Sequence, residues 1–174
     1  RNRTGPGRSM VVFYPINVTG RSQSVADRTP SEEWQRLRAS ILERLRRARY
    51  VGYGKTLNEI LGSLSDRSPL DYCAQMIGVL LLNLRASAGK MTETRLFSPL
   101  RVLLGPAAET SLGALAGLSL GNSISKAGND TRFWKTLLGH VRKYQEYLSD
   151  LSEEKKRELI RFLQEAVIAF HSEP

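Results

Sequence analysis

The sequence is poor in the residues that build redox and metal centres. It contains one cysteine, Cys73, and two histidines, His140 and His171. A single cysteine forms no disulfide within the chain, and this set is too small for a cysteine-rich zinc site or a three-histidine metal site. A lone cysteine is also typical of reducing compartments. We therefore expect an intracellular protein, cytoplasmic or nuclear, with no metal and no cofactor.

Long apolar runs are missing as well. The longest nearly uncharged stretch, residues 107–124, contains Glu109 and many glycine and serine residues, so it does not predict a membrane span. No segment resembles a signal peptide. We expect a soluble protein. The chain starts at Arg1 rather than at methionine, which indicates a processed product or a piece of a longer protein.

The sequence also lacks a catalytic pattern. Residues 52–56 end like a phosphate-binding loop, but Arg49 stands where the first glycine is required, and a predicted helix precedes the segment. No strand-turn-helix nucleophile motif is present. Paired glutamates fall in the first turns of predicted helices, where they stabilise the helix dipole. These observations predict that the protein is not an enzyme.

What is present fits one globular domain with an added arm. The chain has 174 residues, of which 41% are hydrophobic and 25% charged, and these values are ordinary for a folded domain. Glycine and proline interrupt residues 1–28, which we expect to form an extended N-terminal arm. Residues 29–174 are expected to form a single helical domain. An apolar run in the arm has no partner strand elsewhere, so we expect it to lie on the helical body or to mediate assembly with another copy. The candidate assembly residues in this run are Val12, Phe13 and Tyr14.

Start signals and apolar spacing predict the helices. Thr29-Pro30-Ser31-Glu32 is a capping box that opens a helix to about Tyr50. Another helix is predicted over about residues 68–88. Its apolar residues point in every direction, which predicts burial on all sides. Other helices are expected at residues 56–64, near 98–105, at 131–149 and after Glu153. The predicted fold class is therefore all-α, a compact bundle of about six or seven helices around a buried central helix.

A glycine-rich segment leaves two interpretations open. Gly113, Gly117 and Gly121 are spaced four apart between Pro106 and Lys126, so a helix there places all three close to one face. Such a face favours tight internal packing in a soluble chain, because the corresponding dimerisation motif is diagnostic only in lipid. An irregular segment is the alternative.

The net charge of +9 indicates an acidic partner. The first fifty residues contain eleven arginines, no lysine and four acidic residues. Arginine binds phosphate through two parallel hydrogen bonds and stacks on bases, so this bias favours nucleic acid, and RNA over DNA. Basic residues alternate with tyrosines after residue 43, and a second basic group follows residue 130. The candidate nucleic-acid-binding residues are Arg44, Arg46, Arg47, Arg49, Tyr50, Tyr53, Lys55, Lys135, Arg142 and Lys143.

Three functional interpretations follow from these patterns. The first is a non-enzymatic, RNA-binding protein of the nucleocapsid or packaging type, which forms homo-oligomers through residues 1–28. The second is a helical scaffold that binds a peptide or a partner helix, with an incidental charge. The third is a peripheral, matrix-type protein whose arginine face binds an anionic membrane.

Overall fold

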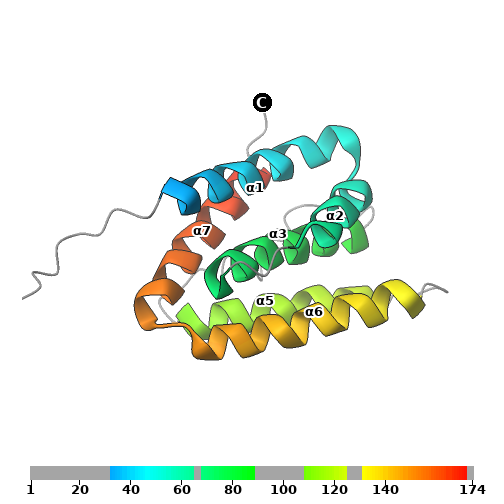
Figure 1. Cartoon of the computed structure of the whole chain (residues 1–174). Helices are drawn as coiled ribbons and strands as arrows, with labels where there is room; N and C mark the ends of the chain where they lie inside the picture. Colours follow the sequence, from blue (N-terminus) through cyan, green and yellow to red (C-terminus); the bar gives the residue numbers. More distant parts are fainter. Residues whose placement is uncertain (1–31, 65–67, 89–107, 125–130, 172–174) are drawn as a thin grey trace, which may run out of the picture.

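A computed structural model of the chain describes residues 32–64, 68–88, 108–124 and 131–171. Within these ranges it contains six helices and no strand, which confirms the all-α prediction (Figure 1). The helices are α1 (Glu32–Val51), α2 (Tyr53–Gly62), α3 (Pro69–Ala88), α5 (Ala108–Ile124), α6 (Thr131–Asp150) and α7 (Glu153–His171). The predicted arm, including Val12, Phe13 and Tyr14, and the predicted helix near 98–105 lie outside the described residues.

Helix α3 is the centre of the bundle. Every residue from Tyr72 to Leu84 is buried, and α3 contacts each of the other five described helices. Figure 1 shows α3 between α1 on one side and the pair α5 and α6 on the other. The sequence predicted this burial, because a helix that is apolar on all faces is stable only when other helices surround it. Its first turn is capped as expected, since the Asp71 N–H donates to Ser68 Oγ at 3.1 Å.

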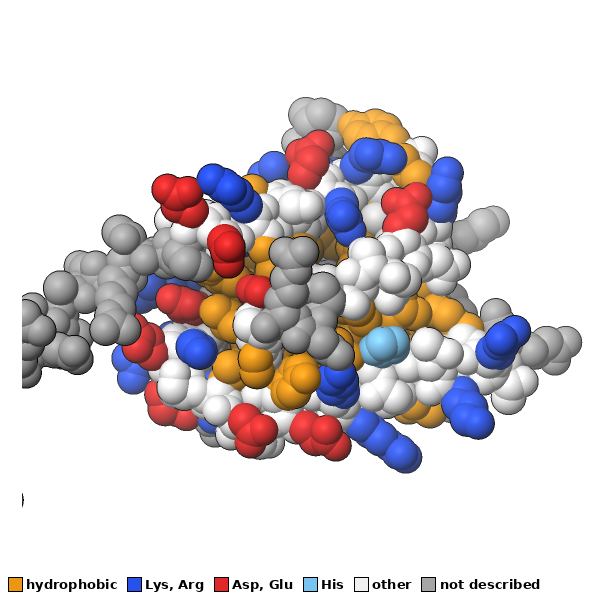
Figure 2. All heavy atoms as spheres, viewed as in Figure 1, with side chains coloured by type: hydrophobic (Ala, Val, Ile, Leu, Met, Phe, Trp, Pro, Cys, Tyr) orange, Lys and Arg blue, Asp and Glu red, His pale blue; other side chains and the backbone are white. Residues whose placement is uncertain are grey.

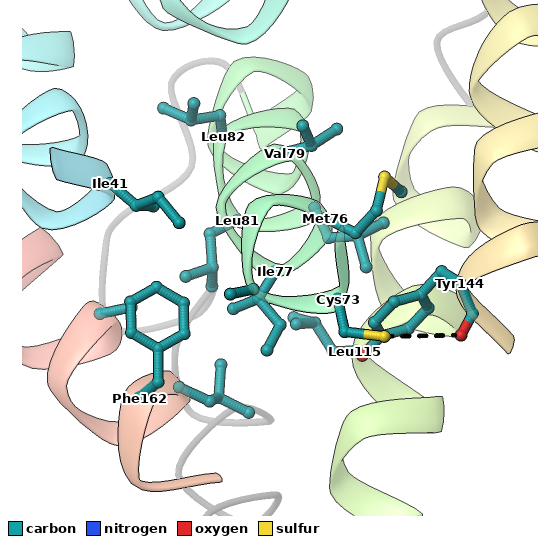
Figure 3. Close-up of a cluster of buried hydrophobic side chains, with 14 of the residues drawn as sticks. Ile41, Cys73, Met76, Ile77, Val79, Leu81, Leu82, Leu115, Tyr144 and Phe162 are labelled. Atoms are coloured by element: carbon teal, nitrogen blue, oxygen red, sulfur yellow. Dashed lines mark hydrogen bonds between the residues drawn. The ribbon is translucent and has the colours of Figure 1, made fainter. Parts of the chain in front are cut away.

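The core around α3 is closed by side chains from four other helices (Figure 3). Ile41 of α1, Leu115 of α5, Tyr144 of α6 and Phe162 of α7 all point toward it and are buried. Close approach of α1 and α3 depends on Gly78, because a Cβ at this position would lie 3.0 Å from Ile41 Cγ2.

Buried hydrogen bonds fix the register of α5 against its neighbours. Asn83 Nδ2 of α3 donates to Ser119 Oγ at 2.9 Å, and Ser119 Oγ donates to the Leu80 carbonyl at 3.1 Å. The Tyr144 hydroxyl of α6 donates to the Leu112 carbonyl at 3.1 Å. These groups are buried, so each bond also removes the cost of leaving a polar atom without a partner.

The glycine-rich segment forms α5, but the expectation of tight packing on its glycine face is wrong. Gly113, Gly117 and Gly121 are exposed, and a Cβ added at any of them meets no heavy atom within 4 Å. The inward face carries Leu112 and Leu115 instead. Burial of the large leucine side chains outweighs anything that the glycines gain by packing, and the spacing of small residues alone does not show which face points inward.

The chain turns sharply between α1 and α2. Gly52 has a φ of 105°, which is the region that favours glycine. The turn places α2 against α1, and α2 begins at Tyr53, earlier than the expected Thr56. Gly54 therefore lies within the first turn of α2. The Thr56 hydroxyl donates to the Gly52 carbonyl at 3.2 Å, and the Thr56 N–H donates to the same carbonyl at 3.1 Å, so both bonds lie at the start of α2.

Candidate nucleic-acid interface

Helix α1 is amphipathic in the way its spacing predicts. Trp34, Ile41, Leu45 and Ala48 are buried along one stripe, and Leu37 is half-buried between them. Because this stripe fills the inward face, most of the arginines must point outward. Of the four arginines near the end of α1, Arg49 lies in the last turn, at the negative end of the helix dipole, where a cation stabilises a helix. The number of arginines alone is therefore no evidence of function.

Three of these four arginines are exposed. Arg47 has no hydrogen-bond or ion-pair partner among the described residues, and Arg44 Nη1 donates to the neutral Ser63 Oγ at 3.3 Å. The Arg46 side chain is 59% exposed and lies 3.9 Å from a Glu43 carboxylate oxygen. An exposed pair at this distance is weak and is screened by salt. All three guanidinium groups can therefore reach a phosphate without breaking a buried contact.

Arg49 has a different position from the one predicted. It is half-buried, and its Nη2 donates to the main-chain carbonyl of Phe170 in the last turn of α7. This carbonyl belongs to a helix C-terminus, where the acceptors have no partner within the helix. Arg49 thus caps α7 and ties it to α1, and its guanidinium is directed at its own chain.

The two candidate tyrosines also differ. Tyr50 is 80% exposed, so its ring is open to solvent. Tyr53 is half-buried, its ring centroid lies 5.6 Å from that of Phe170, and the Arg85 guanidinium lies 5.4 Å from its centroid. Tyr53 therefore contributes to packing between α2, α3 and α7. Of the two rings, Tyr50 is the one available for stacking.

A hollow of about 250 Å³ lies between α1 and α2. Its lining residues are Arg44, Arg47, Thr56, Glu59 and Ser63. Only the two arginines were predicted as site residues. The other three come from α2 and the residue that follows it, and no local pattern in the sequence shows that the turn at Gly52 brings them opposite α1. Lys55, the remaining candidate of this region, is exposed on α2 and is not part of the lining.

The second basic group lies on α6. Arg132, Lys135 and Arg142 are exposed, and Figure 2 shows basic side chains gathered over the N-terminal part of this helix, with acidic ones toward its other end. Lys143 is half-buried, and its Nζ lies 5.2 Å and 5.5 Å from the ring centroids of Tyr72 and Tyr147. Lys143 therefore covers aromatic rings of the bundle. Because α3 lies between α1 and α6, the structure does not bring the two basic groups together.

Near Lys143, the half-buried His140 has a partner within the bundle. Its Nδ1 lies 2.8 Å from the Tyr72 hydroxyl, and the two rings pack at a centroid distance of 6.3 Å. This hydrogen bond gives His140 a structural role within the bundle.

Cys73 lies in the core and lacks the surroundings of a nucleophile. Burial raises the pKa of its thiol to about 12, and its Sγ contacts the Tyr144 carbonyl at 3.9 Å (Figure 3). Burial also raises the pKa of the Tyr144 hydroxyl well above its usual value, and Cys73 adds to this effect. A reactive cysteine needs a lowered pKa and solvent access. Cys73 has neither.

Two further properties of the described residues bear on other functions. No group of three or more histidine, cysteine, aspartate or glutamate residues there could hold a metal ion. None of these helices is long and apolar enough to cross a membrane. Comparisons with protein-family models, with curated proteins and with solved structures found no match.

Proposed function

We propose that the protein binds single-stranded nucleic acid, RNA in preference to DNA, through the outward side of the α1 C-terminal half. This surface consists of Arg44, Arg46, Arg47 and Tyr50 and is called the α1 arginine surface below. The observation that carries the proposal is the 80% exposure of Tyr50 next to exposed guanidinium groups. A tyrosine at this position contributes little to the core, so its ring is available to stack on a base.

The chemistry of the α1 arginine surface fits an unpaired strand. Arg46 and Arg47 precede Tyr50 by four and three residues, so they are its neighbours on the helix surface. Guanidinium groups hold phosphates through charge-assisted hydrogen bonds, and an exposed ring stacks on a base that is not paired. A duplex hides its bases in the stack, and a duplex binder would therefore have no use for Tyr50.

The test is binding of a short fluorescent oligouridylate, measured by polarisation over a range of salt concentrations. The parent protein should bind, and log Kd should rise linearly with log salt as counterions are released, with a slope of about 0.7 per phosphate contact. Replacing Arg44, Arg46 and Arg47 together with Glu should abolish binding at moderate salt. These side chains are exposed, so circular dichroism should show an intact fold.

The matched control reverses three exposed arginines elsewhere, namely Arg36, Arg157 and Arg161. The total charge then changes by the same amount, but the α1 arginine surface stays intact. The control should retain most of the affinity of the parent. Equal losses in the two triple variants would mean that only net charge matters and would contradict a site on α1.

A second candidate function is that of a helical scaffold. A groove of about 280 Å³ lies where α5, α6 and α7 meet, and Leu112, Gly113 and Leu148 contribute to its lining. The exposed glycine face of α5 borders this groove at Gly113. A protein partner that binds there would be insensitive to the triple reversal on α1. Assembly through residues 1–28 and binding to an anionic membrane stay predictions.

A further inference from the structure

The hollow between α1 and α2 is lined by charged side chains that form no ion pair with one another. Arg44 and Arg47 line one wall, and Glu59 lines the other. Among the described residues, no cation forms an ion pair with Glu59 within 4.0 Å, and Arg44 is hydrogen-bonded only to the neutral Ser63 hydroxyl. Two guanidinium groups that face a hollow without a paired carboxylate leave their donors open to an anion.

The charges of the lining indicate which anion fits. Two arginines and one glutamate give the hollow one net positive charge. An internal phosphodiester carries one negative charge, whereas a phosphomonoester carries about 1.5 to 2 at neutral pH. The Glu59 carboxylate repels a terminal phosphate or a free phosphate dianion more strongly than it repels a phosphate within a chain. It therefore reduces the preference for a doubly charged phosphate that the two arginines alone would give.

The position of Tyr50 indicates what is attached to that phosphate. Arg47 lines the hollow, and Tyr50 follows it by three residues, so their Cβ atoms are about 5–6 Å apart. This distance is short enough for a base to reach the exposed ring while its own phosphate is in the hollow. Tyr53 offers no second platform, because its ring packs against Phe170.

We propose that the hollow binds one internal phosphodiester of single-stranded RNA and that the adjoining base stacks on Tyr50. This proposal rests on the proposed function and adds a location, a preferred type of phosphate and a single stacking contact. Glu59 is assigned a selective role, namely reduction of the preference that the two arginines alone would give to the doubly charged phosphate at the end of a strand.

The first experiment tests the phosphate contact with the full chain and the labelled oligouridylate. Replacing both Arg44 and Arg47 with Ala should lower the slope of log Kd against log salt by about 0.7, which corresponds to one phosphate. The control replaces Arg36 and Arg161 with Ala. Both residues are exposed and lie outside the hollow, so the slope should stay unchanged. If the Arg44→Ala, Arg47→Ala variant keeps the parental slope of log Kd against log salt, the proposed phosphate contact in the hollow is overturned.

The second experiment tests the role of Glu59. Oligouridylates with a 5′-hydroxyl and with a 5′-phosphate are compared, and inorganic phosphate serves as a competitor. In the parent the added 5′-phosphate should give only a small gain in affinity, and inorganic phosphate, which offers no base to Tyr50, should compete poorly. Glu59→Gln should strengthen binding of the 5′-phosphorylated strand several-fold more than that of the other strand. Glu43→Gln makes the same charge change outside the hollow and should favour neither strand. Equal effects of the two substitutions would overturn the selective role.

The third experiment separates a base from a lipid, because the headgroup of phosphatidylglycerol is also a phosphodiester. Tyr50→Leu should weaken RNA binding by about five-fold or more, the effect of losing one stacked base. Binding to phosphatidylglycerol vesicles should be weak in the parent and should not fall in this variant, because leucine enters a membrane at least as readily as tyrosine. Tight vesicle binding together with unchanged RNA binding by Tyr50→Leu would overturn the stacking contact.

The outcomes distinguish this proposal from the broader one. If the parent fails to bind RNA, or if the triple reversal on α1 has no effect, the proposed function fails and the hollow loses its ligand. A different result would reject only the hollow. RNA binding would be lost in the triple reversal, but the Arg44→Ala, Arg47→Ala variant would keep the parental salt slope, and Glu59→Gln would not change the relative affinity for the 5′-phosphorylated strand. The proposed function would then stand, and the hollow would not be the binding site.

Discussion

Replacing Arg49 and Arg47 separately with Ala should divide their effects between stability and binding. The two residues lie two positions apart on α1 and were both predicted to bind nucleic acid. Arg49 is half-buried and donates to the Phe170 carbonyl, which is 121 residues away in the sequence, whereas Arg47 is exposed. Arg49→Ala should therefore destabilise the fold, and Arg47→Ala should weaken RNA binding.

The size of the stability effect follows from the contact that is lost. A hydrogen bond that involves a charged group contributes about 1.5–3 kcal/mol. Arg49 is half-exposed, so the lower end of this range applies. The same substitution leaves a carbonyl of the last α7 turn without its donor and removes a cation from the end of α1, each of which adds a few tenths of a kcal/mol. We expect Arg49→Ala to lower the free energy of unfolding by about 2 kcal/mol, and Arg47→Ala to change it by less than about 0.5 kcal/mol.

Urea unfolding followed by far-ultraviolet circular dichroism measures the first effect, and polarisation of the labelled oligouridylate at low urea measures the second. Arg49→Ala should keep the affinity of the parent within about two-fold, because its guanidinium is directed at α7. The reasoning is refuted if Arg49→Ala retains full stability and binds RNA as weakly as Arg47→Ala does. The hydrogen bond from Arg49 to the Phe170 carbonyl would then contribute nothing to stability.

Two further predictions concern α3. Leu80→Asp places an unpaired charge among buried side chains and should cost several kcal/mol. Ala86→Asp, at an exposed position near the end of the same helix, should cost only about 1 kcal/mol through lower helix propensity and the helix dipole. Similar urea midpoints for the two variants would contradict the central position of α3. Burial raises the Cys73 pKa to about 12, so native protein should resist iodoacetamide at pH 8 and react at once in urea. The raised pKa also implies a contribution to stability that is complete below the pKa of the unfolded thiol, about 8.5, and is lost between that value and about pH 12. Fast alkylation of native protein at pH 8 would show that α3 opens.

Patterns within single helices allowed much of the fold to be predicted. The continuous apolar surface of residues 72–84 and the Ser68 cap are local features, and the structure confirms both. The glycine face of α5 was assigned to the wrong side because its small residues and its leucines share one helical period. Only the surrounding helices decide which of the two faces is buried.

The candidate site was less accessible to prediction, because partners distant in sequence decide which basic residues are available. Arg49 and Tyr53 read as parts of a basic and aromatic run, yet Phe170 of α7 engages both. No sequence pattern indicated that Glu59 and Ser63 would line the candidate site. They reach the site because the chain reverses at Gly52 and places α2 beside α1.

Helix electrostatics explains why one exposed tyrosine carries more of the functional argument than the arginines do. An amphipathic helix places its charged residues outward whether or not they bind a ligand, and Arg49 in the last turn of α1 also stabilises that helix through its dipole. Arg132 and Lys135 lie at the start of α6, which has no acidic residue in its first turn, and there the dipole opposes them. Their presence points to a demand other than helix stability. The exposed ring of Tyr50 likewise serves no helix and no core. The proposed ligand, an anion with an unstacked base, would engage both Tyr50 and the guanidinium groups of the α1–α2 hollow, whereas a general excess of positive charge would make no use of the ring.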